Sequence, residues 1–223
     1  MDTGLLRNAA GKFAAGFLIL AFLLFLPAGT VAYPNGWLFC ALLFIPMLIL
    51  GIVLLKKAPG LLEKRLDTKE RETTQKLVTG LCALVFLAGF ITAGLDFRFG
   101  WSAVPVWITG AASVLFLIAY ALYAEVMREN AYLSRTVTIQ ENQKVIDTGL
   151  YGIVRHPMYA ATVLLFLMIP LVLGSWTAFA VFLLYVPLIM IRIRNEEAVL
   201  EAGLAGYTAY KMRVRYRLIP YIW

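Results

Sequence analysis

The sequence is poor in the residues that most often build metal sites and disulfide frameworks. Among its 223 residues there are two cysteines and one histidine. Cys40 and Cys82 both lie inside apolar runs, so neither a disulfide framework nor a metal-ligand spacing is available to them. We therefore expect two small core residues and no metal site.

Charged residues are also scarce, at 15% of the chain, whereas hydrophobic residues make up 61% and the mean hydropathy is +0.80. This balance leaves no room for a separate soluble domain and is typical of a protein that crosses a membrane several times. The prediction is an all-α integral membrane fold of about six apolar helices. The expected segments are 13–33, 36–55, 77–95, 101–127, 157–173 and 176–191.

The first four segments reach the ~20 residues needed to span a bilayer, but the last two are shorter. They share the turn Gly174-Ser175-Trp176 and form either two short tilted spans or a re-entrant hairpin. Few polar residues interrupt the first four segments, which argues against a continuous aqueous path and against a non-enzymatic small-molecule carrier. The main ones are Thr92, Thr109, Ser113 and Glu125.

The basic residues predict the orientation in the membrane. Nineteen of the twenty Lys and Arg residues fall in the N-terminal segment, in the connections 56–76 and 128–156, and in the stretch from Arg192 onward, and Arg98 is the exception. Since cytoplasmic loops carry excess positive charge, we expect both termini in the cytoplasm. The net charge of +7 flanks apolar spans, so we expect contacts with membrane lipids and no nucleic-acid binding.

The connections divide the chain into residues 1–127, which hold the first four spans, and residues 128–223, which hold the polar motifs. An interfacial helix is expected after Pro59-Gly60, and a short strand at residues 136–140. The tail should be helical over 194–202, break around Gly203 and Gly206, resume through Tyr210 and fold back as a cap. Five prolines mark kinks: Pro27, Pro46, Pro105, Pro170 and Pro187.

The only histidine lies in Gly149-Leu-Tyr-Gly-Ile-Val-Arg-His-Pro-Met-Tyr159, where a polar connection meets an apolar run. Pro157 is well suited to the first position of a helix, whose free N–H groups attract anions. Arg155 and His156 adjoin those amides, and Tyr159 shares the helix face of His156. The alternative is that Arg155 reaches lipid phosphates and that the tyrosines form an aromatic belt at the membrane surface.

A second polar cluster ends the following apolar run. Arg192 and Glu196 are four residues apart on one helix, and Glu197 adjoins them. Ionisable groups at membrane depth are costly and are usually functional or paired, although a solvated helix end is the other interpretation. Because the intervening hairpin is tight, the two clusters should be neighbours in space.

These motifs, in this order, resemble the isoprenylcysteine carboxyl methyltransferase family in its bacterial branch, which is related to phospholipid N-methyltransferases. The resemblance rests on GLYGIVRHPMY, then an apolar hairpin, RNEE and GYTAYKMRVRYRLIP, over roughly residues 125–220. It implies a helical fold in a bacterial inner membrane that binds S-adenosylmethionine without a Rossmann domain. The absence of a Gly-x-Gly-x-x-Gly fingerprint is compatible with that.

The resemblance also implies roles for individual residues. Cofactor binding would fall to Tyr151, His156, Pro157, Tyr159 and Glu197, with Tyr207 and Tyr210 closing over the cofactor. Arg192, Arg155 and Glu196 would serve the acceptor, Arg192 by holding a carboxylate. The chain departs from many relatives at Leu150, where they have proline, and at Ala161, where they have glycine.

The implied activity is methyl transfer from S-adenosylmethionine to a lipophilic acceptor that enters from the bilayer. A carboxylate acceptor is already nucleophilic, so alignment would matter more than acid or base chemistry. A phospholipid or other amine acceptor would need a general base, for which Glu196 and Glu197 are candidates. A membrane reductase of the sterol type, using NADPH, is a further alternative.

Overall fold

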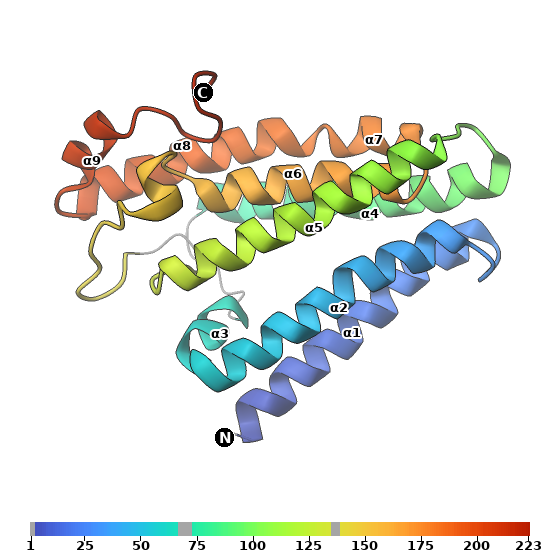
Figure 1. Ribbon diagram of the computed structural model, residues 1–223, viewed down its shortest axis with the longest axis horizontal. Coiled ribbons are helices and arrows are strands. Elements are labelled where there is room, and N and C mark those ends of the chain that lie inside the picture. Colours follow the sequence, from blue (N-terminus) through green and yellow to red (C-terminus); the bar gives the residue numbers. More distant parts are fainter. Residues whose placement is uncertain (1–2, 67–72, 135–138) are drawn as a thin grey trace.

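The protein is described from a computed structural model that covers residues 3–66, 73–134 and 139–223. Long helices run along the longest axis of the molecule and alternate in direction (Figure 1). Five of the described helices are long and apolar enough to cross a membrane, and a sixth apolar helix is shorter. The prediction of an all-helical membrane protein with about six apolar helices is confirmed.

The first two helices form a hairpin. Helix α1, Thr3–Ala28, ends before Gly29, whose φ of 68° suits glycine, and α2, Pro34–Lys57, begins at a proline. A short helix, α3, Pro59–Leu66, follows at once, as expected after Pro59-Gly60. The α1–α2 pair separates from α5 toward the end of the molecule that holds α3 (Figure 1).

The next pair consists of α4, Thr73–Phe99, and α5, Val106–Glu129. Pro105 is the residue before α5, so it begins this helix instead of kinking it, and residues 101–105 are not helical. The expected start of this segment at residue 101 was therefore five residues too early. Helix α4 packs against α1, α7 and α8, which places it in the middle of the bundle.

The final hairpin consists of α6, Pro157–Val172, followed by α7, Trp176–Phe182, and α8, Tyr185–Gly203. The break between α7 and α8 lies at Leu183 and Leu184. Pro187 explains this break, because a proline has no N–H to donate to the carbonyl four residues earlier, which here belongs to Leu183. Together α7 and α8 are long enough to span a membrane, whereas the 16 residues of α6 are fewer than a full crossing needs.

The tail follows the expected course. Helix α8 ends at Gly203, Gly206 has a φ of 84°, and α9 covers Tyr207–Arg213. The predicted strand at residues 136–140 lies largely outside the described residues, and Ile139 and Gln140 are not in a strand. Both termini, α3 and α9 lie toward one end of the bundle, which we call the basic end (Figure 1).

The opposite end is closed by a buried carboxylate, that of Asp96 near the end of α4. Its Oδ1 accepts from the Ser102 N–H at 2.7 Å, and its Oδ2 accepts from the hydroxyls of Ser102, Ser175 and Thr177 at 2.5–2.7 Å. Ser175 also accepts from the Ala178 N–H and so caps α7. Asp96 thereby joins the α4–α5 connection to the α6–α7 turn.

Candidate active site

The site is built around the first residues of α6, at the basic end of the bundle. His156 is the residue before the helix and Pro157 is its first residue, as the sequence predicts. The N–H groups of Arg155 and His156 do not face a ligand, because they donate to the carbonyls of Tyr216 and Arg217 in the C-terminal tail, both at 2.9 Å. The tail therefore pairs with the chain just before α6.

Glu197 of α8 connects the two polar clusters of the sequence. Its Oε1 accepts from Arg155 Nε at 2.7 Å and lies 3.2 Å from His156 Nε2, and its Oε2 accepts from Arg217 Nε at 2.9 Å. The Glu197 and Arg155 side chains are each only 4% exposed, and at that burial a charge without a partner would be strongly destabilising. We call Arg155, His156, Glu197 and Arg217 the Glu197 cluster.

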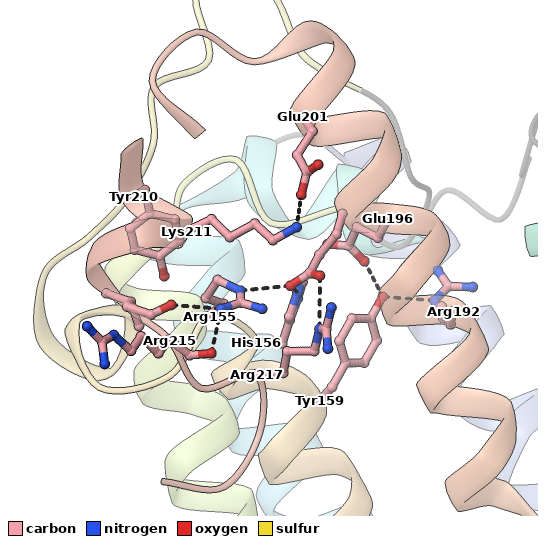
Figure 2. Close-up of polar contacts among 12 residues, drawn as sticks. Arg155, His156, Tyr159, Arg192, Glu196, Glu201, Tyr210, Lys211, Arg215 and Arg217 are labelled. Carbon is pink, nitrogen blue, oxygen red and sulfur yellow. Dashed lines mark hydrogen bonds and ion pairs between the residues drawn. The ribbon is translucent and has the colours of Figure 1, made fainter. Parts of the chain in front are cut away.

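Arg155 also fixes the tail. Its Nη1 donates to the carbonyls of Val214 and Arg215 at 2.8 and 2.7 Å (Figure 2). One buried guanidinium thus contacts α8 and the segment after α9. The first turn of α6, the end of α8 and the tail are held together by charge-assisted hydrogen bonds, which are stronger than neutral ones.

A second polar chain passes beside this cluster. The Tyr159 hydroxyl donates to Glu196 Oε2 at 2.5 Å and accepts from Arg192 Nε at 2.9 Å (Figure 2). Arg192 also donates through Nη1 to the Thr79 hydroxyl of α4 at 3.1 Å. Tyr159 therefore links Glu196 and Arg192, which both belong to α8.

A cavity of about 110 Å³ opens next to these residues at the basic end. Its charged and ionisable lining includes Lys144, Arg155, His156, Arg192 and Glu196. It is lined further by segment 130–134, segment 143–146 and the tail beyond α8. We call it the polar cavity.

Tyrosines cover the polar cavity from α9 and from the connection before α6. The Tyr210 hydroxyl donates to the Tyr151 carbonyl at 2.8 Å, and the Tyr151 hydroxyl accepts from Asn130 Nδ2 at 2.8 Å. The Tyr207 hydroxyl differs, because it is buried and has no hydrogen-bond partner among the described residues. Burial, and then the nearby Glu197 and Glu196, raise the pKa of Tyr207, so its hydroxyl stays protonated and can still donate to a ligand.

A larger and mostly apolar cavity, of about 490 Å³, lies deeper among the helices. Phe86 of α4, Phe166 of α6 and Tyr185 of α8 line it and contact one another through their rings. Further lining comes from α2, α3 and α5. Its volume lies within the roughly 300–1,000 Å³ that is common for small-molecule sites. We call it the apolar cavity.

The two cavities have three lining residues in common, namely Met158, Tyr159 and Arg192. The first turn of α6 and Arg192 therefore separate a polar compartment from an apolar one. A molecule in the polar cavity and a molecule in the apolar cavity would come closest to each other at this boundary.

Most of the site residues predicted from the sequence come together here. Two of them, Pro157 and Glu197, are buried but do not line the polar cavity. Glu196 lines it instead of Glu197, which resolves which of the two adjacent glutamates faces the cavity. The predicted residues that line the polar cavity are Tyr151, Arg155, His156, Tyr159, Arg192, Glu196, Tyr207 and Tyr210.

Sequence reasoning missed Asn130, Arg217 and the lining segment 143–146. Arg217 was counted only as one of the basic residues that indicate orientation. Its position among the tail's arginines carries no signal that distinguishes it from Arg213 or Arg215. The residues of segment 143–146 follow no helical or strand period, so only the folded chain brings them to the cavity.

The two departures from the family pattern have different consequences. Leu150 donates its backbone N–H to Glu129 Oε2 at 3.2 Å, a bond that a proline at this position could not make. Ala161 is buried in α6. Neither change removes a polar side chain from the site.

Comparison with known proteins supports the resemblance. The family model of the isoprenylcysteine carboxyl methyltransferase (ICMT) family matches residues 111–202, from α5 through α8. The uncharacterized protein YpbQ of Bacillus subtilis (strain 168) is 26% identical over 96 residues, which cover 43% of this chain and 57% of YpbQ. The aligned part thus spans little more than half of that relative.

The fold is similar to a solved structure over nearly the whole chain. The eukaryotic intramembrane Ras methyltransferase ICMT aligns with a TM-score of 0.54 and 12% identity, over 95% of this chain and 83% of that one. The family match covers the polar hairpin and the structural match extends to the helices before it. The chain is thus similar to the isoprenylcysteine carboxyl methyltransferase family in sequence over residues 111–202, and similar in fold to a solved methyltransferase of that name over nearly its whole length.

Proposed function

We propose that the protein is a membrane methyltransferase that transfers the methyl group of S-adenosylmethionine to the carboxylate of a lipophilic acceptor. The observation that carries the proposal is the boundary at Met158, Tyr159 and Arg192, which the polar and the apolar cavity share. A polar cofactor and an apolar acceptor need separate compartments that meet at one point. The basic end of the bundle would then face the cytoplasm, where the excess of Lys and Arg indicates it belongs.

The residues of the polar cavity fit the cofactor chemically. The amides of Met158 and Tyr159 begin α6 and have no partner within the helix, so they suit the cofactor's carboxylate. Glu196 suits its amino group, and the faces of Tyr159 and Tyr207 suit its sulfonium cation. The Tyr207 hydroxyl, which has no hydrogen-bond partner among the described residues, is itself a donor available to a ligand.

The cover of the polar cavity must move for the cofactor to bind. A cavity of about 110 Å³ is below the roughly 300 Å³ at which small-molecule sites begin. Segment 143–146 and α9 form its cover, whereas α6 and α8 are packed in the bundle. Cofactor binding would displace the cover and leave the first turn of α6 in place.

Glu197 takes a positioning role in this proposal. Both of its carboxylate oxygens are already bound by Arg155, His156 and Arg217. It would hold Arg155 and His156 against α6, and through Arg217 it would hold the tail that carries the cover. Glu196, four residues from Arg192, is the acid that reaches the cofactor.

For transfer, bound S-adenosylmethionine would supply an electrophilic methyl group on a sulfonium. Arg192 would hold the acceptor carboxylate at the cavity boundary, with Tyr159 fixing the orientation of its guanidinium through the 2.9 Å hydrogen bond. The carboxylate would gain an O–C bond as the sulfonium C–S bond breaks, and the neutral thioether would be the leaving group. The ester has lost the negative charge that Arg192 held, which favours its release.

An amine acceptor is the second candidate, and one observation favours it. Glu196 lines the polar cavity beside the boundary residue Tyr159, where a general base would be needed. Replacing Glu196 with glutamine separates the two candidates. For an amine acceptor, turnover is lost while cofactor binding persists, whereas for a carboxylate acceptor turnover falls only as far as cofactor binding does.

The first test is calorimetry of S-adenosylmethionine with the full chain purified in neutral detergent. We expect saturable binding that His156→Ala weakens at least tenfold and that Lys57→Gln, which lies outside both cavities, leaves unchanged. Transfer of a labelled methyl group into a lipid extract then tests the reaction. A folded wild-type protein that binds NADPH and not S-adenosylmethionine would overturn the proposal.

A further inference from the structure

The apolar cavity has a second arginine in its lining, and this residue is distant in the sequence from the motifs of the C-terminal half. Arg65 belongs to α3 and is partly buried. Its Nη1 donates to the Ser134 carbonyl at 3.2 Å and lies 3.7 Å from Met158 Sδ. Its Nη2 donates to the Tyr123 hydroxyl, and the guanidinium lies 5.5 Å from the centroid of that ring. Helix α3 thus sends one charged group into the bundle.

The partners of Arg65 among the described residues are all electrically neutral. A carbonyl, a phenol and a thioether can orient a guanidinium, but they do not balance its charge. Within the described part of the chain, no carboxylate pairs with Arg65. A charge that borders an apolar cavity among membrane helices is costly without a partner of opposite sign.

The whole lining of the apolar cavity has the same one-sided charge. Its described lining contains two arginines, Arg65 and Arg192, and no aspartate or glutamate. Glu196 lines the polar cavity and not this one. An amphiphile with a negative head group would match the lining, whereas a protonated amine would be repelled by it.

The two arginines approach the same turn of α6. Arg65 contacts Met158, and Arg192 contacts Tyr159, the next residue. Met158 and Tyr159 are also the residues at which the two cavities meet. An anion between the two guanidinium groups would therefore lie at the cavity boundary, where the methyl group must be delivered.

We propose that Arg65 is an acceptor-binding residue, and that with Arg192 it binds the carboxylate of an amphiphile whose hydrocarbon part fills the apolar cavity. The proposal rests on the proposed function, because it concerns the acceptor of that reaction. It adds a residue from outside the family match, which begins at residue 111. Arg65 would make the site selective for acceptors that carry a negative charge.

The experiment compares binding of a long-chain fatty acid and of its uncharged primary amide to the full chain in neutral detergent, by calorimetry. The variants are Arg65→Gln and the matched control Lys64→Gln. Lys64 is the neighbouring cation of α3, but it binds Gln140 Oε1 at 2.6 Å and does not line the cavity. S-adenosylmethionine binding is measured on every variant.

We expect the wild type to prefer the fatty acid over the amide. Arg65→Gln should weaken fatty-acid binding roughly 10- to 100-fold and leave amide binding unchanged, since a hydrogen bond between charged groups is lost. Arg65→Lys should restore part of the preference, because it keeps the charge without the planar fork. Lys64→Gln should behave as the wild type does.

Two results would overturn the proposal. Equal weakening of both amphiphiles, together with loss of S-adenosylmethionine binding, would mean that Arg65 only anchors the segment at Ser134. A wild type that binds S-adenosylmethionine but does not distinguish the fatty acid from its amide would mean that the cavity does not select for charge. A wild type that fails to bind S-adenosylmethionine but selects the fatty acid, with the selectivity lost in Arg65→Gln, would count against the proposed function while upholding the role of Arg65.

Discussion

The two ends of the bundle each contain a buried carboxylate, and the two are stabilised in different ways. Glu197, at the basic end, is surrounded by Arg155, His156 and Arg217. Asp96, at the opposite end, accepts one backbone N–H and three hydroxyls, all neutral. Glu197 joins α6, α8 and the tail, whereas Asp96 joins two connections between helices.

The difference separates the end of the bundle that borders the polar cavity from the end that borders neither cavity. Asp96 and its donors line neither the polar nor the apolar cavity, and their hydrogen bonds are completed within the protein. The Glu197 cluster forms the wall behind the polar cavity, and two of its members, Arg155 and His156, line that cavity. A change at the basic end should therefore affect ligand binding, and a change at the opposite end should affect stability alone.

The largest effect is expected from Glu197→Gln. Glutamine leaves Arg155 and Arg217 without a balancing charge, and removing one partner of a buried ion pair costs about 3–5 kcal/mol. We expect a lower thermal midpoint in detergent and a loss of S-adenosylmethionine affinity of roughly 100-fold or more. The control is Glu201→Gln, whose carboxylate pairs with Lys211 at the surface and should change stability by less than about 0.5 kcal/mol. Equal effects of the two variants would contradict the special role of Glu197.

Asp96→Asn should reduce stability and leave the site intact. Asparagine offers one acceptor oxygen in place of two, so some of the four donors lose their partner, at about 1–3 kcal/mol. We expect a lower thermal midpoint, with S-adenosylmethionine affinity within twofold of the wild type. Ser113→Ala, which removes a hydroxyl bonded only within α5, serves as the control. Loss of S-adenosylmethionine binding in folded Asp96→Asn would contradict the claim that a change at this end affects stability alone.

Two tyrosines of α9 allow a finer comparison within the basic end. Tyr207→Phe removes a hydroxyl that has no partner among the described residues, so stability should stay constant or rise slightly. Tyr210→Phe removes a hydrogen bond to the Tyr151 carbonyl and should cost about 1 kcal/mol. If the Tyr207 hydroxyl serves the cofactor, Tyr207→Phe should weaken S-adenosylmethionine binding about five- to tenfold in calorimetry. Unchanged affinity in Tyr207→Phe would remove that residue from the cofactor site.

The smallest effect concerns alkaline pH. Burial raises the pKa of Tyr151, Tyr207 and Tyr210 in the folded protein. Below about pH 10 these phenols are neutral in both the folded and the unfolded chain, so they contribute no pH dependence to the free energy of unfolding there. Above that value the unfolded chain releases their protons and the folded chain retains them, so stability should fall as the pH rises. Thermal midpoints between pH 8 and 11 test this, and Tyr207→Phe should show a shallower decline than the wild type.

Hydropathy and charge placement determined much of this protein from the sequence alone. Bilayer thickness requires apolar segments of about 20 residues, so the helices could be placed before their packing was known. His156-Pro157 began α6, and Gly203 and Gly206 bounded the break before α9, because these residues impose local backbone geometry. The tight hairpin then brought Arg155 and His156 to Glu197, as expected from the short connection.

Only the tertiary structure decided which of the neighbouring residues face the cavities. Glu196 and Glu197 are about 100° apart around α8, and packing against α6 and the tail turned Glu197 toward Arg155 and left Glu196 at the polar cavity. Arg65 is one of seven basic residues in its connection, and no local pattern marks it as the one that enters the bundle. Local sequence fixes where a helix starts and how long it is, but the direction in which a side chain points depends on contacts with segments distant in the chain.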